Sequence, residues 1–189
     1  MQIGLYFGSF NPIHTGHCII AAHLINTTAL DQVWFVVSPQ NPLKNSNSLL
    51  NEYHRLHLIK VAIEEEPALK ASDIEFHLPK PSYTVHTLAY LKEKYPRHEF
   101  AVIMGSDSFQ NLNKWKNAEL IIAQYNIYVY TRPGFPVVNT ARQNVTVLDA
   151  PLLDISSTRI REYIRNKKSI SFLVPEKVKD EIEKNGYYK

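Results

Sequence analysis

The segment Phe7-Gly8-Ser9-Phe10-Asn11-Pro12-Ile13-His14-Thr15-Gly16-His17 follows an apolar run and precedes apolar residues at helical spacing. This order predicts the first strand-to-helix turn of an α/β fold. The turn contains neither GxGxxG nor GxxxxGKS/T, so the two commonest nucleotide cradles of α/β proteins are excluded here. His14 and His17 lie three residues apart at a helix start, so their side chains share a face. Backbone amides, the positive end of the helix dipole and two imidazoles that can take up a proton together predict a phosphate site.

The rest of the chain alternates short apolar runs with amphipathic stretches, which is typical of βαβ units around a parallel sheet. We expect strands at about 3–7, 33–37, 72–76, 99–104, 126–130 and 145–148. We expect helices at about 16–26, 52–65, 84–95, 157–166 and 176–184, with a short irregular helical piece at 108–120. In the first helix, the spacing of Cys18, Ile19, Ala22 and Ile25 predicts the face that packs on the sheet. The fold predicted is α/β: a Rossmann-like, doubly wound, mainly parallel sheet with helices on both faces and its ligand where the strand order reverses.

Composition limits the class of protein. The chain has 189 residues, of which 44% are apolar and 21% charged, so we expect one folded domain over residues 1–189. Cys18 is the only cysteine, which excludes an intramolecular disulfide and a multi-thiolate metal site and favours the cytoplasm. No apolar run is long enough for a membrane span, and the N-terminus lacks the basic start of a secretory signal. A net charge of +3 is too small to predict binding to duplex nucleic acid.

The histidine pair has two plainer interpretations, a cap on the turn and a metal site. Metal binding is disfavoured because no nearby Asp, Glu or Cys would complete the ligand set. The whole stretch 7–17 resembles the signature turn of the nucleotidyltransferase superfamily, whose HxGH pattern binds the triphosphate of ATP or CTP. The resemblance implies that His14 and His17 stabilise charge on the α-phosphate. It also implies ATP contacts from the backbone of Gly8, Ser9 and Phe10.

A second element stands near the other end of the chain and reads Ile155-Ser156-Ser157-Thr158-Arg159-Ile160-Arg161. Hydroxyl side chains at a helix start also serve as caps, which is the alternative interpretation. A guanidinium one turn later adds a strong phosphate ligand. The stretch resembles the superfamily pattern ISSTxIR, which implies ATP contacts from Ile155, Ser157, Thr158 and Arg161.

Two loop segments resemble those of bacterial nicotinate-mononucleotide adenylyltransferases. Residues 39–44, Pro-Gln-Asn-Pro-Leu-Lys, resemble PxxPxK, and the resemblance implies that Lys44 reaches the polyphosphate. The alternative interpretation is that Lys44 is an exposed lysine on a proline-rich loop. Glu75 and the later run Pro-Ser-Tyr-Thr-Val-His-Thr-Leu at 81–88 are similar to E…SYTxDTL. This implies that Thr84 helps to hold the pyridine carboxylate, with Ser82 and Tyr83 beside it. Alone, Ser82 and Thr84 are equally typical of helix caps.

Residues 105–116 resemble the family segment GxD…L..W. The resemblance implies that Gly105 and Asp107 contact ATP, with Asp107 on its ribose hydroxyls, and that Trp115 stacks on the pyridine ring with Lys116 nearby. These residue types suit the tasks, because a carboxylate accepts two O–H bonds and an indole offers a flat surface. An isolated tryptophan is more often part of a core. Arg132, in Tyr130-Thr131-Arg132-Pro133-Gly134, matches the RPG turn of the family near the adenine.

The chain also departs from the family pattern. Phe7-Gly8 replaces a glycine pair, Asn11 stands where Asp is common, and His86 replaces the Asp of SYTxDTL. Asn11 is still assigned to the mononucleotide subsite. The basic residue expected before SYT is present only as Lys80, so the contacts to the mononucleotide phosphate stay open.

The resemblance implies adenylyl transfer from ATP to nicotinate mononucleotide, which yields deamido-NAD and pyrophosphate in NAD synthesis. The predicted catalytic residues are His14, His17, Lys44 and Arg161. Mg²⁺ is expected as the partner of ATP, and no carboxylate cluster in the sequence would hold it, so phosphates and water supply its ligands. Two alternatives remain: a related enzyme such as the pantetheine-phosphate adenylyltransferase, and a silent nucleotide-binding module. The sequence leaves a homo-oligomer and the preference for nicotinate over nicotinamide open.

Overall fold

The computed structural model describes residues 1–40, 49–137, 143–151 and 153–189. The strands are β1 (Gln2–Gly8), β2 (Gln32–Val37), β3 (Leu69–Ser72), β4 (Glu99–Gly105), β5 (Asn126–Tyr130) and β6 (Val145–Leu148). The α-helices are α1 (Thr15–Thr27), α2 (Glu52–Ala62), α3 (Thr84–Lys94), α4 (Ser106–Gln110), α5 (Ala118–Gln124), α6 (Ser157–Arg165) and α7 (Glu176–Asn185). Two 3₁₀ turns are η1 (Ile74–His77) and η2 (Leu112–Lys114). No helix in these ranges combines the length and apolar character that a bilayer crossing requires.

The strands form one sheet in the order β3-β2-β1-β4-β5-β6, and all neighbouring strands are parallel. The chain moves outward from β1 to β3 and then returns to place β4 on the other side of β1. The strand order therefore reverses between β1 and β4, and the loops that follow these two strands leave the same edge side by side. Ligands of doubly wound folds bind at such a point, so the predicted fold positions a site there.

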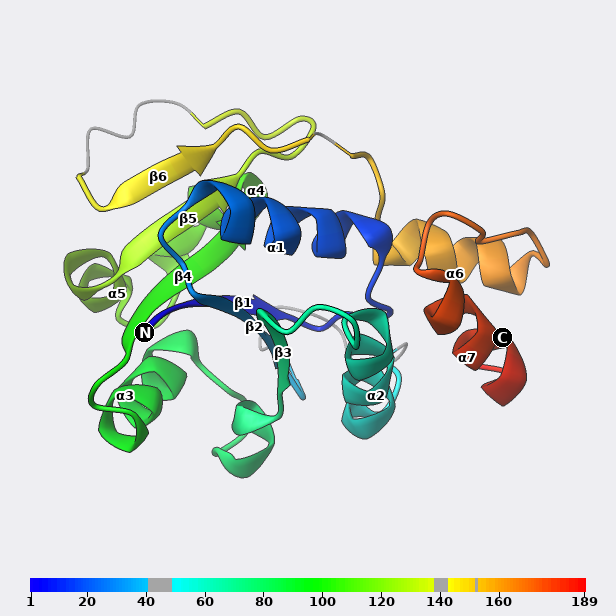
Figure 1. The fold of residues 1–189 in the computed structure, drawn as a ribbon, viewed down its shortest axis with the longest axis horizontal. Coiled ribbons are helices and arrows are strands. Elements are labelled where there is room, and N and C mark those ends of the chain that lie inside the picture. The colour runs from blue at the N-terminus through cyan, green and yellow to red at the C-terminus, as the bar shows by residue number, and fades with distance from the viewer. Residues whose placement is uncertain (41–48, 138–142, 152) are drawn as a thin grey trace.

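Helices cover both faces of the sheet, as predicted. On one face, Phe35 and Ile103 belong to a core that also contains buried residues of α1, α2, α6 and α7. On the other face, Leu5 and Val102 pack with buried residues of α3 and α5. Figure 1 shows that α1 begins at the end of the molecule where α6 and α7 stand, although about 140 residues separate these helices in the sequence.

Two details of the predicted elements are wrong. The third strand ends at Ser72, and the stretch 73–77 that alternates polar and apolar residues turns into η1, where the Phe76 N–H donates to the Asp73 carbonyl. The fully buried side of α1 is formed by Ile20, Ala21 and Leu24 rather than by the predicted set Cys18, Ile19, Ala22 and Ile25, which is only partly buried. This helix is apolar around most of its circumference, so spacing alone does not select one face.

The irregular piece predicted at 108–120 consists of three short elements, α4, η2 and the start of α5. The other predicted strands and helices are confirmed, with ends displaced by a few residues.

Candidate active site

The turn after β1 is shaped by an aromatic side chain. Phe10 has a φ of 44°, is 3% exposed, and packs edge-on against Tyr6, His17 and Phe35. A Cβ atom at Gly8 would lie 2.8 Å from Cζ of Phe10, so only glycine fits beside this ring. Gly8, which the sequence assigns to close approach of a ligand, is thus required by the packing of the turn itself.

The two histidines form a stacked pair at the start of α1. Their ring centroids lie 3.6 Å apart with planes 23° from parallel, and the His14 N–H donates to Nδ1 of His17 at 3.3 Å. A nitrogen that accepts a hydrogen bond carries no proton, so the proton of a neutral His17 ring lies on Nε2. The stacked pair thus fixes which nitrogen of a neutral His17 ring is the donor.

The environment of His14 keeps its ring neutral. His14 is 7% exposed, and burial, aided by the positive charge of Arg132, lowers its pKa from 6.5 to about 4. Without a bound anion, the His14 ring is therefore neutral at neutral pH. A bound phosphate would oppose both causes, because a nearby negative charge favours the protonated ring.

The start of α6 is attached to the β1 turn. The Arg161 guanidinium donates through Nη1 to the Asn11 carbonyl at 2.8 Å, and the Ser157 hydroxyl donates to the Pro12 carbonyl at 2.8 Å. Ser156 caps the helix by accepting from the Arg159 N–H. The capping interpretation therefore holds for Ser156, whereas Ser157 and Arg161 join the two motifs that the sequence predicts for ATP.

Arg161 lies close enough to Thr158 for a long contact of 3.4 Å between Nη2 and Oγ1. Burial lowers the pKa of Arg161, yet a guanidinium in a protein stays charged. Its Nε is buried without a hydrogen-bond partner among the described residues. This cation thus keeps donor capacity beside the histidine turn.

Two residues predicted for ATP, Asp107 after β4 and Arg132 after β5, form an ion pair. The Arg132 Nη1 donates to Oδ2 of Asp107 at 3.0 Å, and the Arg132 N–H donates to the Ser106 hydroxyl at 2.9 Å. A Cβ atom at Gly105 would lie 2.5 Å from Oδ1 of Asp107 and 2.9 Å from Cδ of Arg132, so this pair needs glycine there. Oδ1 of Asp107 has no hydrogen-bond partner among the described residues and remains an acceptor for a ligand hydroxyl.

An open pocket lies between the β1 turn and the end of β5. It is lined by Tyr6, His14, Gly16, His17, Ile20, Tyr130, Thr131, Arg132, Pro151, Leu153 and Ile155. The fold therefore brings together four residues that the sequence assigns to ATP, namely His14, His17, Arg132 and Ile155. Three further residues of that set, Ser157, Thr158 and Arg161, lie at the adjoining start of α6.

Among the described residues predicted for the mononucleotide, none lines this pocket. Lys116 Nζ is 4.6 Å from the ring centroid of Tyr83, and Trp115 is half-buried against the core that contains Leu5. Thr84 is half-buried as the first residue of α3. Lys44 lies outside the described residues.

Two predicted mononucleotide residues have internal partners. The Ser82 hydroxyl donates to the Glu75 carboxylate at 2.6 Å, and Oδ1 of Asn11 accepts from the Leu50 N–H at 3.1 Å. The capping interpretation of Ser82 is therefore replaced by a buried hydrogen bond. In the sequence analysis, Glu75 stands out only as part of a family pattern, and Arg55 is not identified. The signal that could have identified Arg55 is a lone arginine among the buried Leu56, Leu58 and Ile59 of α2.

Comparisons with known proteins show the family and the fold. A family described as cytidylyltransferase-like matches residues 5–163. Over the full length of both proteins, the chain is 52% identical to a probable nicotinate-nucleotide adenylyltransferase of Flavobacterium psychrophilum. It is 50% identical to a protein of the same name from Cytophaga hutchinsonii, across 100% of this chain and 98% of that one. Among solved structures, nicotinic acid mononucleotide adenylyltransferase of Plasmodium falciparum complexed with NaAD has the same fold, with a TM-score of 0.85. The two sequences are 21% identical, and the match covers 99% of this chain and 97% of that one.

Proposed function

Because this chain belongs to the nicotinate-nucleotide adenylyltransferase family, we propose that it transfers the adenylyl group of ATP to nicotinate mononucleotide. The products are deamido-NAD and pyrophosphate. The observation that carries the proposal at the level of the site is the attachment of α6 to the β1 turn, through Arg161 on Asn11 and Ser157 on Pro12. This attachment places the two motifs predicted for ATP, with their hydroxyls, imidazoles and guanidinium, side by side.

The chemical step needs positioning and charge neutralisation more than proton transfer. A phosphate oxygen of the mononucleotide forms a bond to the α-phosphorus of ATP, and the bond from that phosphorus to pyrophosphate breaks. The attacking phosphate is already ionised at neutral pH, so no general base is required. Preorganised donors that meet the charge developing on the α-phosphate supply the main catalytic effect.

The residues keep the roles that their motifs imply. We propose His14, His17, Lys44 and Arg161 as the catalytic residues. ATP is bound by these histidines and Arg161 together with Gly8, Ser9, Phe10, Gly105, Asp107, Arg132, Ile155, Ser157 and Thr158. The mononucleotide is bound by Asn11, Lys44, Ser82, Tyr83, Thr84, Trp115 and Lys116. The Ser82 hydroxyl donates to Glu75 and Oδ1 of Asn11 accepts from the Leu50 N–H, so both residues also hold the protein's own segments together.

Magnesium enters as part of the substrate. Among the described residues, no group of three or more His, Cys, Asp and Glu side chains is placed to hold a metal ion. Asp107, the carboxylate that follows β4, pairs with Arg132 through Oδ2 and keeps Oδ1 for a ligand hydroxyl. We therefore propose that Mg²⁺ is bound by the ATP phosphates and water. We also propose that residues 1–189 act as one nucleotidyltransferase domain in the cytoplasm.

The test is pyrophosphate release from Mg²⁺ and ATP, with nicotinate mononucleotide, nicotinamide mononucleotide and pantetheine phosphate offered separately. We expect release to be far fastest with nicotinate mononucleotide. Release with pantetheine phosphate alone would replace the proposed acceptor, and release with none of the three would reject adenylyl transfer to these substrates.

A further inference from the structure

Thr15 occupies the variable position of the HxGH pattern at residues 14–17. The two histidines and the glycine of this pattern line the pocket, whereas Thr15 does not. Its N–H donates to the Leu173 carbonyl at 2.9 Å, and its hydroxyl donates to the Phe172 carbonyl at 3.1 Å. Both donors of Thr15 are therefore used on a turn that lies as far as 157 positions away in the sequence.

The turn at residues 170–174, which binds Thr15, is anchored at both of its ends. Ile170 and Val174 are each 3% exposed and belong to the core that also contains buried residues of α1 and α2. Between them, Phe172 has a φ of 67°, which side chains other than glycine rarely adopt, and it is 92% exposed. Phe172 therefore meets the rest of the protein through its backbone carbonyl on Thr15 rather than through its ring.

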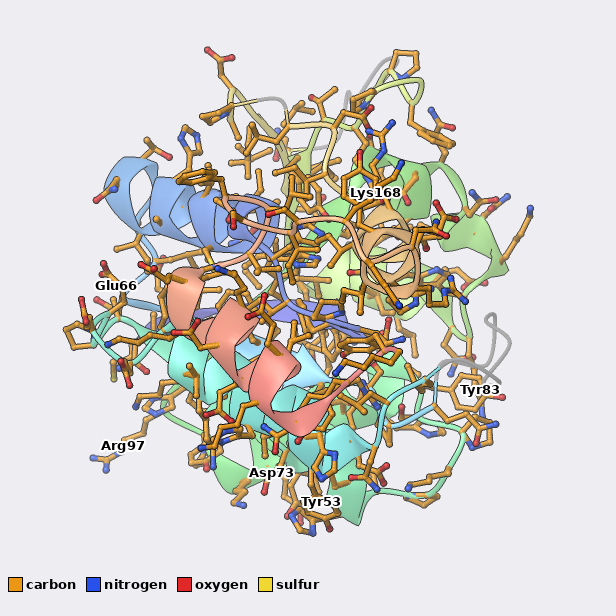
Figure 2. The ribbon with its side chains drawn as sticks, turned by 90° about the vertical axis from the view of Figure 1, so that its right-hand side faces the viewer. Tyr53, Glu66, Asp73, Tyr83, Arg97 and Lys168 are labelled. Carbon is orange, nitrogen blue, oxygen red and sulfur yellow. The ribbon has the colours of Figure 1, made fainter. Side chains whose placement is uncertain are left out.

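The helix that follows this turn, α7, is fixed to α2 by apolar packing and by ion pairs. Val178 and Ile182 are buried in the same core as residues of α2. Lys177 Nζ forms ion pairs with the carboxylates of Glu64 and Glu65, which follow α2. Figure 2 views this side of the molecule and shows α7 in front of α2. These contacts give the turn a fixed place relative to the start of α1.

We propose that Thr15 is a positioning residue: its two hydrogen bonds to the turn 170–174 fix the start of α1 and so hold the rings of His14 and His17 in their reactive arrangement. This inference rests on the proposed function. Both histidines lie within two residues of Thr15, and preorganised donors lose much of their effect when they are misplaced by about 1 Å. The C-terminal turn, which does not line the pocket beside the histidines, thereby contributes to the reaction.

Three substitutions at Thr15 separate its two hydrogen bonds. Thr15→Ser keeps both bonds, Thr15→Val removes the hydroxyl bond, and Thr15→Pro removes both. Proline fits this position, because Thr15 is the first residue of α1 and the preceding His14 is extended, with a φ of −143° and a ψ of 168°. The matched control is Thr27→Val at the other end of α1, where the hydroxyl donates to the His23 carbonyl at 2.7 Å.

Turnover should fall as these hydrogen bonds are removed. We expect kcat to stay within about twofold of the parent in Thr15→Ser, to fall about threefold to tenfold in Thr15→Val, and to fall about tenfold to a hundredfold in Thr15→Pro. Affinity for nicotinate mononucleotide, measured by calorimetry, should change far less than kcat, because most residues predicted for it lie outside the start of α1. Thr27→Val should leave both quantities unchanged.

The histidine rings provide a readout that does not depend on the reaction. The rings of His14 and His17 stack with centroids 3.6 Å apart, so ring currents make the NMR shifts of their carbon-bound protons sensitive to the stacking. These signals should move in Thr15→Pro and stay in place in Thr15→Ser and Thr27→Val. The proposed function fails separately, if the parent protein releases no pyrophosphate with nicotinate mononucleotide.

Three results would overturn the positioning role: kcat of folded Thr15→Pro within about twofold of the parent, equal kcat in Thr15→Val and Thr15→Ser, or unmoved histidine signals in Thr15→Pro. A purely structural role would lower the melting temperature and leave kcat per folded molecule unchanged. If Thr15→Pro does not fold, the comparison of Thr15→Val with Thr15→Ser and Thr27→Val decides alone.

Discussion

Protonation of His14 should make the free energy of unfolding depend on pH. The unfolded chain takes up the proton at a pKa near 6.5, whereas the folded chain resists it down to a pKa of about 4. The stability is therefore fully present above pH 6.5, falls as the pH is lowered between these values, and levels off below about pH 4. The total loss is about 3 kcal/mol, and about 2 kcal/mol of it should be lost by pH 5.

The assay is urea unfolding at about pH 7.5 and pH 5, without nucleotide, for the parent and for His14→Asn. Asparagine is a favourable N-cap residue and has no charge change in this range, so the variant should lose about 2 kcal/mol less than the parent on acidification. His86→Gln, at an exposed position of α3, is the matched control and should follow the parent. An equal pH dependence in the parent and His14→Asn would refute the assignment of a neutral, buried His14.

Three further variants test the site and its packing. His17→Ala should lower turnover about a hundredfold or more with the fold intact by circular dichroism, because it removes a preorganised donor; turnover within about tenfold of the parent would contradict its role. Trp115→Ala should weaken mononucleotide binding far more than ATP binding in calorimetry, whereas equal effects would identify Trp115 as a core residue only. Gly8→Ala should destabilise the protein by about 1–3 kcal/mol in denaturant unfolding, because the new Cβ would lie 2.8 Å from Phe10 Cζ; parental stability would show that the ring moves aside easily.

The parallel sheet and the place of its site follow from patterns that are local in the sequence. Residues 33–37 of strand β2 are apolar throughout because helices cover both faces of the sheet, and such a run is recognisable without any partner strand. The third strand was harder to place, because it is an edge strand of only four residues. It is followed by Ile74 and Phe76, whose alternation with polar residues is equally typical of a strand. Only the turn at Asp73, which aims Glu75 inward, distinguishes the two.

The residues predicted for ATP were easier to identify from the sequence than the backbone contacts of Arg55 and Ser38, because their motifs are local in the sequence. His14 and His17 carry their signal within four residues, and Arg161 carries its own within one short motif. The meaning of Arg55 depends on carbonyls that lie as far as 46 positions away, and a carbonyl is present in every residue whatever its side chain. Ser38 is equally hard to identify, because its bonds to Gly8 and Arg55 are both made by its backbone. Residues predicted to bind ATP are therefore visible as motifs, whereas residues that join loops through backbone groups become visible only when the fold shows which groups they join.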